Sequence, residues 1–145
     1  MKEKTFMKTQ SETSHKTFSL SPYLTVRNVD EAVQFYEKAF QFKISEVKSD
    51  DDNTALHAEM TYKDQLIMCG KEGAYGSSIQ APATSSMESP ITLCLYCDDV
   101  DEFYKKSLNH GAKSLSAPED MFWGYRMCRL QDPDAYTWCF MTPTA

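Results

Sequence analysis

Two stretches of this chain repeat one pattern 71 residues apart, and this repeat limits the possible folds more than any other feature. The segment that starts at Asn28 aligns with the segment that starts at Asp99, and both contain a Val-Asp-Glu triplet. A run of apolar and β-branched residues precedes each copy, at 23–26 and at 91–97. Internal similarity at a fixed spacing indicates two copies of one structural unit.

Each copy begins with the features of a helix start. The side chains of Asn28 and Asp99 can accept hydrogen bonds from the free amides of a first helical turn. Glu31 and Glu102 follow at the spacing of a capping box. Apolar residues then recur every three or four positions, which is typical of an amphipathic helix that packs on a sheet.

Short strand patterns follow each helix, and turn residues separate them. We expect strands over 42–48, 55–62 and 65–69 in the first copy and over 112–116, 125–130 and 137–141 in the second. The order β-α-β-β-β therefore occurs twice, and we predict an α+β fold whose two repeats form a curved mixed sheet. The predicted parts are a flexible N-terminal tail (1–17), a single domain (18–145), unit one (18–69), a Gly-, Ser-, Ala- and Pro-rich linker (70–90) and unit two (91–142).

Composition narrows the classes of partner. The chain has 145 residues and a formal net charge of −6, without the basic cluster that nucleic-acid binding requires. It contains no apolar run of about 18 residues, so we expect no membrane partner. The N-terminal residues lack a continuous apolar stretch, hence no secretory signal is expected and a cytoplasmic location is predicted. In that compartment the five cysteines would be reduced thiols.

Five blocks of sequence resemble the vicinal oxygen chelate superfamily, which includes glyoxalase I, extradiol dioxygenases and bleomycin- and fosfomycin-resistance proteins. The blocks are residues 22–26, 35–40, 57–60, 117–126 and 132–138. Within the superfamily, the chain is most similar to the PhnB-like glyoxalase/bleomycin-resistance group. The resemblance implies that the two units form a cup whose concave face holds a small-molecule ligand, often with a divalent metal. It also implies a homodimer.

The residues at the metal positions of this superfamily favour a cup without metal. Metal-using relatives supply His and Glu ligands from four strand positions, which correspond here to Ser21, Glu59, Thr92 and Cys139. Only Glu59 is a ligand of the family type, whereas a catalytic zinc site commonly has about three protein ligands. We therefore expect no metal and no other cofactor. The alternative is an atypical metal site built from His57, Glu59, Cys94, Cys128 and Cys139.

The segment Cys94-Leu95-Tyr96-Cys97 is not expected to be a zinc or redox motif of the Cys-x-x-Cys kind. On an extended strand, residues three apart point to opposite faces, and the chain has no second such pair.

Strand alternation predicts which side chains face the cup. Aromatic residues, with Tyr136 among them, would form a wall suited to a planar or apolar ligand with a polar edge. Arg126 is expected on the cup face, where it would pair with Glu59 or hold an anionic ligand, and Cys128 is expected beside it. The predicted ligand-binding residues are Tyr23, His57, Glu59, Thr92, Tyr96, Phe122, Trp123, Tyr125 and Arg126.

Two functions of different classes follow from these residues. The first is a protein that binds a small aromatic or amphipathic molecule in a metal-poor cup without reacting it. The alternative is a metal-dependent lyase, isomerase or dioxygenase in which Glu59 or His57 moves a proton. A domain whose cup binds nothing is a third possibility. Whether the protein is an enzyme stays open, and no catalytic residue is assigned.

Overall fold

The computed structural model describes residues 20–144, so the expected tail at 1–17 lies outside the described residues. The predicted β-α-β-β-β order is confirmed in both units. Unit one contains β1 (Tyr23–Val26), α2 (Val29–Phe40), β2 (Lys43–Ser49), β3 (Ala55–Tyr62) and β4 (Gln65–Lys71). Unit two contains β5 (Thr92–Tyr96), α4 (Val100–Asn109), β6 (Lys113–Asp120), β7 (Tyr125–Gln131) and β8 (Thr137–Pro143). None of the helices described between residues 20 and 144 is both long and apolar enough to cross a membrane.

Both helices start at the expected caps. The Asn28 side chain accepts a hydrogen bond from the Glu31 amide at 2.9 Å, and the Asp99 side chain accepts one from the Glu102 amide at 3.2 Å. Helix α2 ends at Phe40, and the next residue, Gln41, adopts a left-handed conformation with φ of 62°. The first residue of each amphipathic helix is therefore set by a capping side chain in its own sequence.

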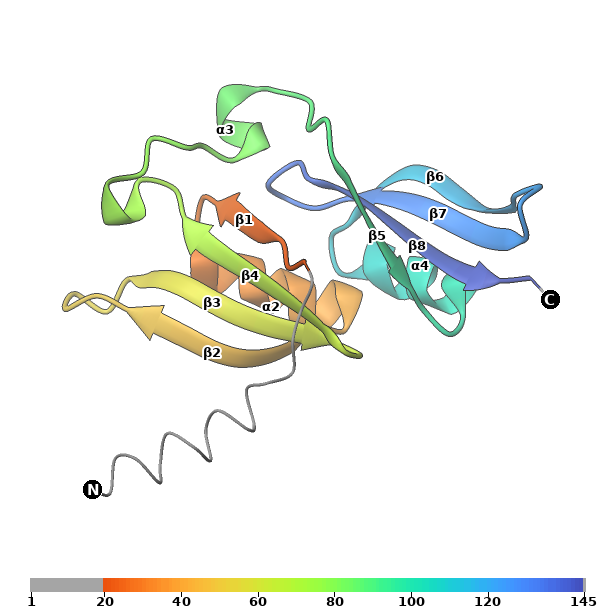
Figure 1. The fold of residues 1–145 in the computed structure, drawn as a ribbon, viewed down its shortest axis with the longest axis horizontal. Helices are drawn as coiled ribbons and strands as arrows, with labels where there is room; N and C mark the ends of the chain where they lie inside the picture. Colours follow the sequence, from red (N-terminus) through yellow and green to blue (C-terminus); the bar gives the residue numbers. More distant parts are fainter. Residues whose placement is uncertain (1–19, 145) are drawn as a thin grey trace, which may run out of the picture.

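Each unit makes its own four-stranded mixed sheet. The strand order is β1-β4-β3-β2 in one sheet and β5-β8-β7-β6 in the other, and the first strand of each unit pairs in parallel with the last. In Figure 1, the two sheets lie side by side, with α2 behind the first and α4 behind the second. The uncovered faces of both sheets thus point in the same direction. We call them open face 1 (sheet of β1 to β4) and open face 2 (sheet of β5 to β8).

A shared aromatic core joins the two units behind the sheets. Phe40 at the end of α2 is fully buried, and its ring centre lies 4.8 Å from that of Phe140 and 5.5 Å from that of Trp138 on β8. Phe103 on α4 packs against Phe140 at 4.1 Å. Trp138 is 1% exposed and is therefore part of this core. Because side chains of both units fill one core, neither unit would keep its apolar surface buried alone.

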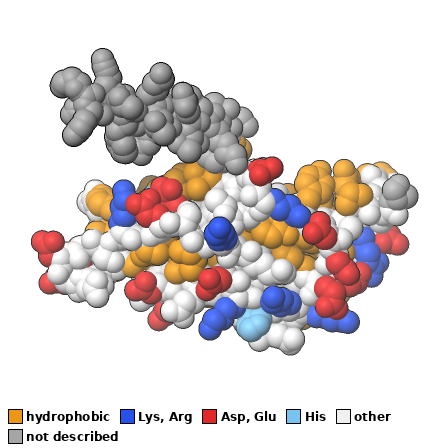
Figure 2. Space-filling model, turned by 90° about the horizontal axis from the view of Figure 1, so that it is seen from below, with side chains coloured by type: hydrophobic (Ala, Val, Ile, Leu, Met, Phe, Trp, Pro, Cys, Tyr) orange, Lys and Arg blue, Asp and Glu red, His pale blue; other side chains and the backbone are white. Residues whose placement is uncertain are grey.

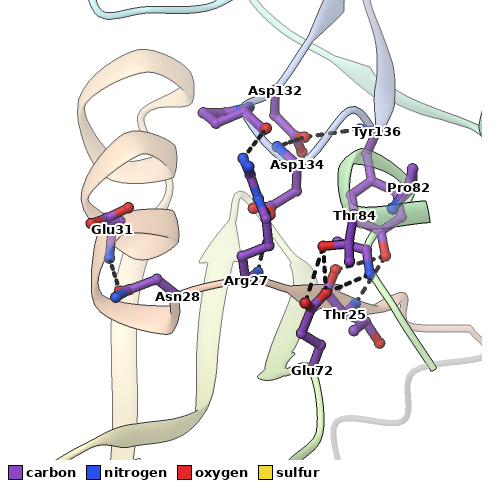
Figure 3. Close-up of polar contacts among 12 residues, drawn as sticks. Thr25, Arg27, Asn28, Glu31, Glu72, Pro82, Thr84, Asp132, Asp134 and Tyr136 are labelled. Atoms are coloured by element: carbon purple, nitrogen blue, oxygen red, sulfur yellow. Dashed lines mark hydrogen bonds and ion pairs between the residues drawn. The ribbon is translucent and has the colours of Figure 1, made fainter. Parts of the chain in front are cut away.

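A polar seam also joins the units, as the close-up in Figure 3 shows. The guanidinium of Arg27, after β1, donates to Asp134 in the β7–β8 loop at 2.9 Å. The hydroxyl of Tyr36 on α2 donates to the buried Asp132 carboxylate at 2.6 Å, and the Trp138 indole donates to the same oxygen at 2.8 Å. The seam fixes the β7–β8 loop of unit two against β1 and α2 of unit one.

The segment between the units contains short helical turns. Strand β4 extends to Lys71, two residues beyond its predicted end, and the connection then includes η1 (Ala74–Gly76) and α3 (Pro82–Ser85). Glu72 accepts hydrogen bonds from the Ala81 amide and the Thr84 hydroxyl, and these bonds lower the pKa of the Glu72 carboxyl. Figure 3 shows these contacts, which attach α3 to the end of β4.

Candidate ligand-binding faces

A row of hydrogen-bonded side chains crosses open face 1. The Tyr23 hydroxyl lies 3.0 Å from His57 Nδ1, and His57 Nε2 lies 3.2 Å from a carboxylate oxygen of Glu59. Tyr23 comes from the edge strand β1. His57 and Glu59 are two residues apart on β3, so their side chains point to the same face of the sheet. The three predicted site residues of unit one are thus brought together.

The chemistry of this row fixes where its protons lie. A carboxylate only accepts hydrogen bonds, so Nε2 of His57 carries the hydrogen and, in the neutral ring, Nδ1 accepts the hydrogen bond that Tyr23 donates. Burial, followed by nearby Tyr75, Cys69 and Glu59, raises the pKa of Tyr23, so its phenol keeps the proton at neutral pH. The row presents a phenol oxygen at one end and a carboxylate at the other, with the His57 ring between them, and both ends can hold the polar edge of a ligand.

Gly70 makes this arrangement possible. A Cβ atom at residue 70 would lie 2.6 Å from the Tyr23 hydroxyl oxygen and 2.9 Å from a ring carbon. These separations are too short for real atoms, so the Tyr23 ring rests directly on the bare backbone of Gly70. The absence of a side chain here lets the Tyr23 hydroxyl reach His57.

Open face 2 is more apolar. The rings of Tyr96 on β5 and Tyr125 on β7 have centres 5.6 Å apart, and the neighbouring Tyr125 hydroxyl raises the pKa of Tyr96. Met127 and Met141 pair with each other across β7 and β8, and Met141 also pairs with Tyr96. Flexible thioether side chains adapt to ligands of different shapes, and the flat tyrosine rings can stack on a planar ligand. Thr92, also predicted for the site, is exposed at the start of β5.

A cavity of about 400 Å³ lies where the β3–β4 turn approaches strand β5. Its lining residues are Tyr62, Lys63, Asp64, Gln65, Cys94, Leu95 and Tyr96. An ion pair between Lys63 and Asp98, 3.0 Å apart, lies at the same junction. The volume is within the range of small-molecule pockets. Of the predicted site residues, Tyr96 contributes to this cavity.

Two further predicted residues, Phe122 and Trp123, form the β6–β7 turn. Phe122 is 95% exposed, and its ring packs edge-on against Trp123 at 4.8 Å. Figure 2, which views the molecule from below the orientation of Figure 1, shows hydrophobic side chains in several separate patches, at the upper edge and among the charged side chains of that face. Phe122 and Trp123 thus present exposed apolar surface at the β6–β7 turn. They do not line the cavity beside Tyr96.

The expectations for Arg126 and Cys128 are wrong. Arg126 donates to Asp101 at 2.9 Å and to Asp120 at 3.1 Å, and these bonds raise its pKa. It therefore lies beside the start of α4, away from Glu59, and its charge is already matched by two carboxylates. Cys128 is fully buried under the helices.

The error comes from one extra residue in the second repeat. Met68, opposite Tyr23 in the ladder, corresponds to Cys139, 71 residues on, but Glu59 corresponds to Arg129, only 70 residues on. The chain from Arg129 to its ladder partner Cys139 is thus one residue longer than the chain from Glu59 to Met68, and a shift of one residue turns every side chain of a strand to the other face. Arg129, which the sequence interpretation missed, is exposed on open face 2. The local alternation Cys128-Arg129-Leu130, in which two apolar residues flank a charged one, is the sequence signal that would have identified it.

Tyr136 does not belong to a ligand-binding wall either. Its hydroxyl donates to the Thr25 carbonyl at 2.9 Å and accepts from the Thr25 amide at 3.0 Å. Both backbone groups on the outer side of β1 are thereby satisfied at this point. Tyr136 is part of the seam between the units and protects a sheet edge from pairing with other strands.

The donor set does not fit the divalent metal that this fold commonly holds. Glu59 lies on open face 1, whereas Thr92 and Cys139 lie on the other sheet, and the Glu59 carboxylate accepts a hydrogen bond from His57. Within residues 20–144 of one chain, no group of three or more His, Cys, Asp or Glu side chains could hold a metal ion. The atypical metal site is divided in the same way. His57 and Glu59 lie on the first sheet, whereas the second sheet carries the three cysteines Cys94, Cys128 and Cys139.

Comparisons with known proteins agree with the architecture. The family model described as "Glyoxalase/Bleomycin resistance protein/Dioxygenase superfamily" matches residues 16–140. An uncharacterised protein of Mycobacterium bovis is 31% identical over 128 residues, which cover 86% of this chain and 83% of that protein. An uncharacterised protein of Mycobacterium tuberculosis H37Rv is also 31% identical over 128 residues, covering 86% of this chain and 74% of that protein.

Solved structures share the fold at low sequence identity. TioX from Micromonospora sp. ML1 superposes with a TM-score of 0.71 at 21% identity, covering 88% of this chain and 99% of that one. The fosfomycin resistance protein FosX from Mesorhizobium loti gives a TM-score of 0.62 at 14% identity, covering 88% and 92%. With its duplicated units and the family match over most of its length, this chain belongs to the Glyoxalase/Bleomycin resistance protein/Dioxygenase superfamily.

Proposed function

We propose that this protein binds a small aromatic or amphipathic molecule on its open sheet faces without the help of a metal. The observation that carries the proposal is the aromatic surface of open face 2. Tyr96 is 55% exposed, contacts Tyr125 and lines a cavity of about 400 Å³. Burying such rings against a flat apolar ligand is favourable, and their hydroxyls can hold a polar group. The narrower assignment to the PhnB-like group is part of this proposal.

A second copy of the chain completes the site in this proposal. Small-molecule sites cover most of the ligand surface, but the two open faces of one chain point in the same direction and cover a ligand from one side only (Figure 1). In a homodimer, open face 1 of one copy can lie opposite open face 2 of its partner. The polar row at Tyr23, His57 and Glu59 and the apolar surface at Tyr96 then meet in one cup.

Anilinonaphthalene sulfonate, an aromatic anion with a polar edge, is a suitable probe because its fluorescence rises on apolar surfaces. We expect saturable binding, with affinity unchanged after treatment with EDTA. Y96A should weaken binding about tenfold, which is about 1.4 kcal/mol. The matched control is M87A, which removes an exposed apolar side chain of the connection and should leave binding unchanged. Equal affinity of Y96A and M87A, or binding that requires an added divalent metal, would contradict the proposal.

The dimer is tested separately by light scattering during size-exclusion chromatography. The expected mass is twice the 16.6 kDa of the chain. A monomer that still binds the probe would overturn the dimer and leave the ligand proposal standing.

A further inference from the structure

Two cysteines face each other across neighbouring strands of open face 2. In the parallel ladder of β5 and β8, Cys94 is directly opposite Cys139. Adjacent strands lie about 4.8 Å apart, which is within the Cα separations of roughly 4.4–6.8 Å that disulfides span. Trp138 and Phe140 pack in the core, so Cys139 between them points to the same face as Cys94.

The two thiols differ in access. Of the five cysteines, all of them within the described residues, Cys94 is exposed and the other four are buried. Cys139 is 1% exposed. Burial, with a smaller contribution from the neighbouring Cys94 thiol, raises the pKa of Cys139 to about 12. A reagent from solution therefore meets Cys94 first, while Cys139 stays protonated beside it on the neighbouring strand.

We propose that Cys94 and Cys139 form a redox-active dithiol in which a small hydroperoxide oxidises Cys94 and Cys139 then closes a disulfide. This pair is unrelated to the Cys94–Cys97 spacing, because Cys97 is buried and contacts the Thr142 hydroxyl at 3.7 Å. The chemistry does not require the ligand proposed above. It places a reversible covalent change beside Tyr96, on the wall of the cavity.

The reaction has two balanced steps. The Cys94 thiolate attacks one peroxide oxygen, the O–O bond breaks, and the leaving alkoxide takes a proton to give an alcohol and a sulfenic acid on Cys94. Cys139 then loses its proton and attacks the Cys94 sulfur, the S–O bond breaks, and water leaves. Two thiols and one hydroperoxide become one disulfide, one alcohol and one water. An external dithiol such as dithiothreitol returns the electrons.

Mass spectrometry of the intact full-length chain after treatment with tert-butyl hydroperoxide tests the pair. We expect a loss of about 2 Da, the mass of two hydrogens, and recovery of the mass with dithiothreitol. After unfolding and alkylation, the oxidised chain should carry three alkyl groups instead of five, and the linked peptides should contain Cys94 and Cys139. C94S should show no loss of about 2 Da, whereas the matched control C97S should lose it as the unmodified chain does.

A second variant keeps the test decisive if the disulfide forms slowly. In C139S the sulfenic acid has no resolving thiol, so dimedone should label Cys94 in this variant more than in the parent chain. Five alkylatable thiols after oxidation, a disulfide between other cysteines, or the same mass loss in C94S would each overturn the proposal.

Discussion

The buried carboxyl of Asp132 should make the stability of the protein depend on pH in a specific direction. Asp132 accepts hydrogen bonds from Tyr36, Trp138 and the amides of Asp134 and Tyr136, all of which favour its charged form. Burial outweighs these bonds and raises the pKa of Asp132 from 3.8 to about 6. The folded state therefore binds the proton more tightly than the unfolded state does.

The sign and size of the effect follow from this difference. The stabilisation is fully present below pH 4 and is lost as the pH rises through 6. A carboxyl pKa raised from 3.8 to about 6 corresponds to about 3 kcal/mol of unfolding free energy. D132N has no charge to titrate at this position. The unfolding free energy of the parent chain should therefore fall relative to that of D132N by about 3 kcal/mol between pH 3.5 and pH 7.5.

Urea unfolding of the parent chain and D132N at several pH values measures this difference directly. Equal dependence on denaturant concentration in the two chains is the control, because it shows that both unfold to the same extent. A difference that stays constant with pH would refute the reasoning. A difference that grows with pH would show that the four hydrogen bonds, and not burial, dominate.

Three other substitutions test separate parts of the structure. G70A places a Cβ atom 2.6 Å from the Tyr23 hydroxyl, which is the end of a half-exposed side chain and can move away. Urea unfolding should therefore change by less than about 1 kcal/mol, whereas the His57 ring resonances should change in NMR spectra. Parent-like spectra would count against the contact. F40A removes the ring shared by both units and should cost about 3–5 kcal/mol; a cost below about 1 kcal/mol would mean that the units do not share one core. R126M breaks the ion pairs with Asp101 and Asp120 but should leave binding of anilinonaphthalene sulfonate unchanged, and a clear loss of affinity would return Arg126 to the ligand site.

The local features of this fold could be predicted because they depend on a few neighbouring residues. Asn28 and Asp99 cap their helices through side chains only three residues from the amides that they bind. The position of His57 and Glu59 on the same face of β3 likewise follows from strand geometry, because the two residues are two positions apart. Both helices and the order of helix and strands along each unit were therefore predictable from the sequence.

Contacts between the two units could not be predicted in this way. Tyr136 is an aromatic residue at the end of a loop, and only the packing of β1 against that loop shows that its hydroxyl binds Thr25. Arg126 was assigned to the wrong face because the repeat spacing changes by one residue across the β7–β8 loop. The pairing of Cys94 with Cys139 likewise depends on the register of a parallel ladder between distant segments.

Methyl NMR of the methionines tests the proposed binding face most directly, because the chain carries its own probes and controls. Met127 and Met141 lie on open face 2 and Met68 on open face 1, whereas Met60 is fully buried and Met87 lies in the connection. On titration of EDTA-treated protein with anilinonaphthalene sulfonate, we expect saturable shifts of the Met127 and Met141 methyl resonances, with Met60 and Met87 unchanged. A shift of Met68 along the same curve is expected if a second copy completes the cup. Unchanged Met127 and Met141 resonances, or shifts confined to Met87, would contradict binding on the open faces.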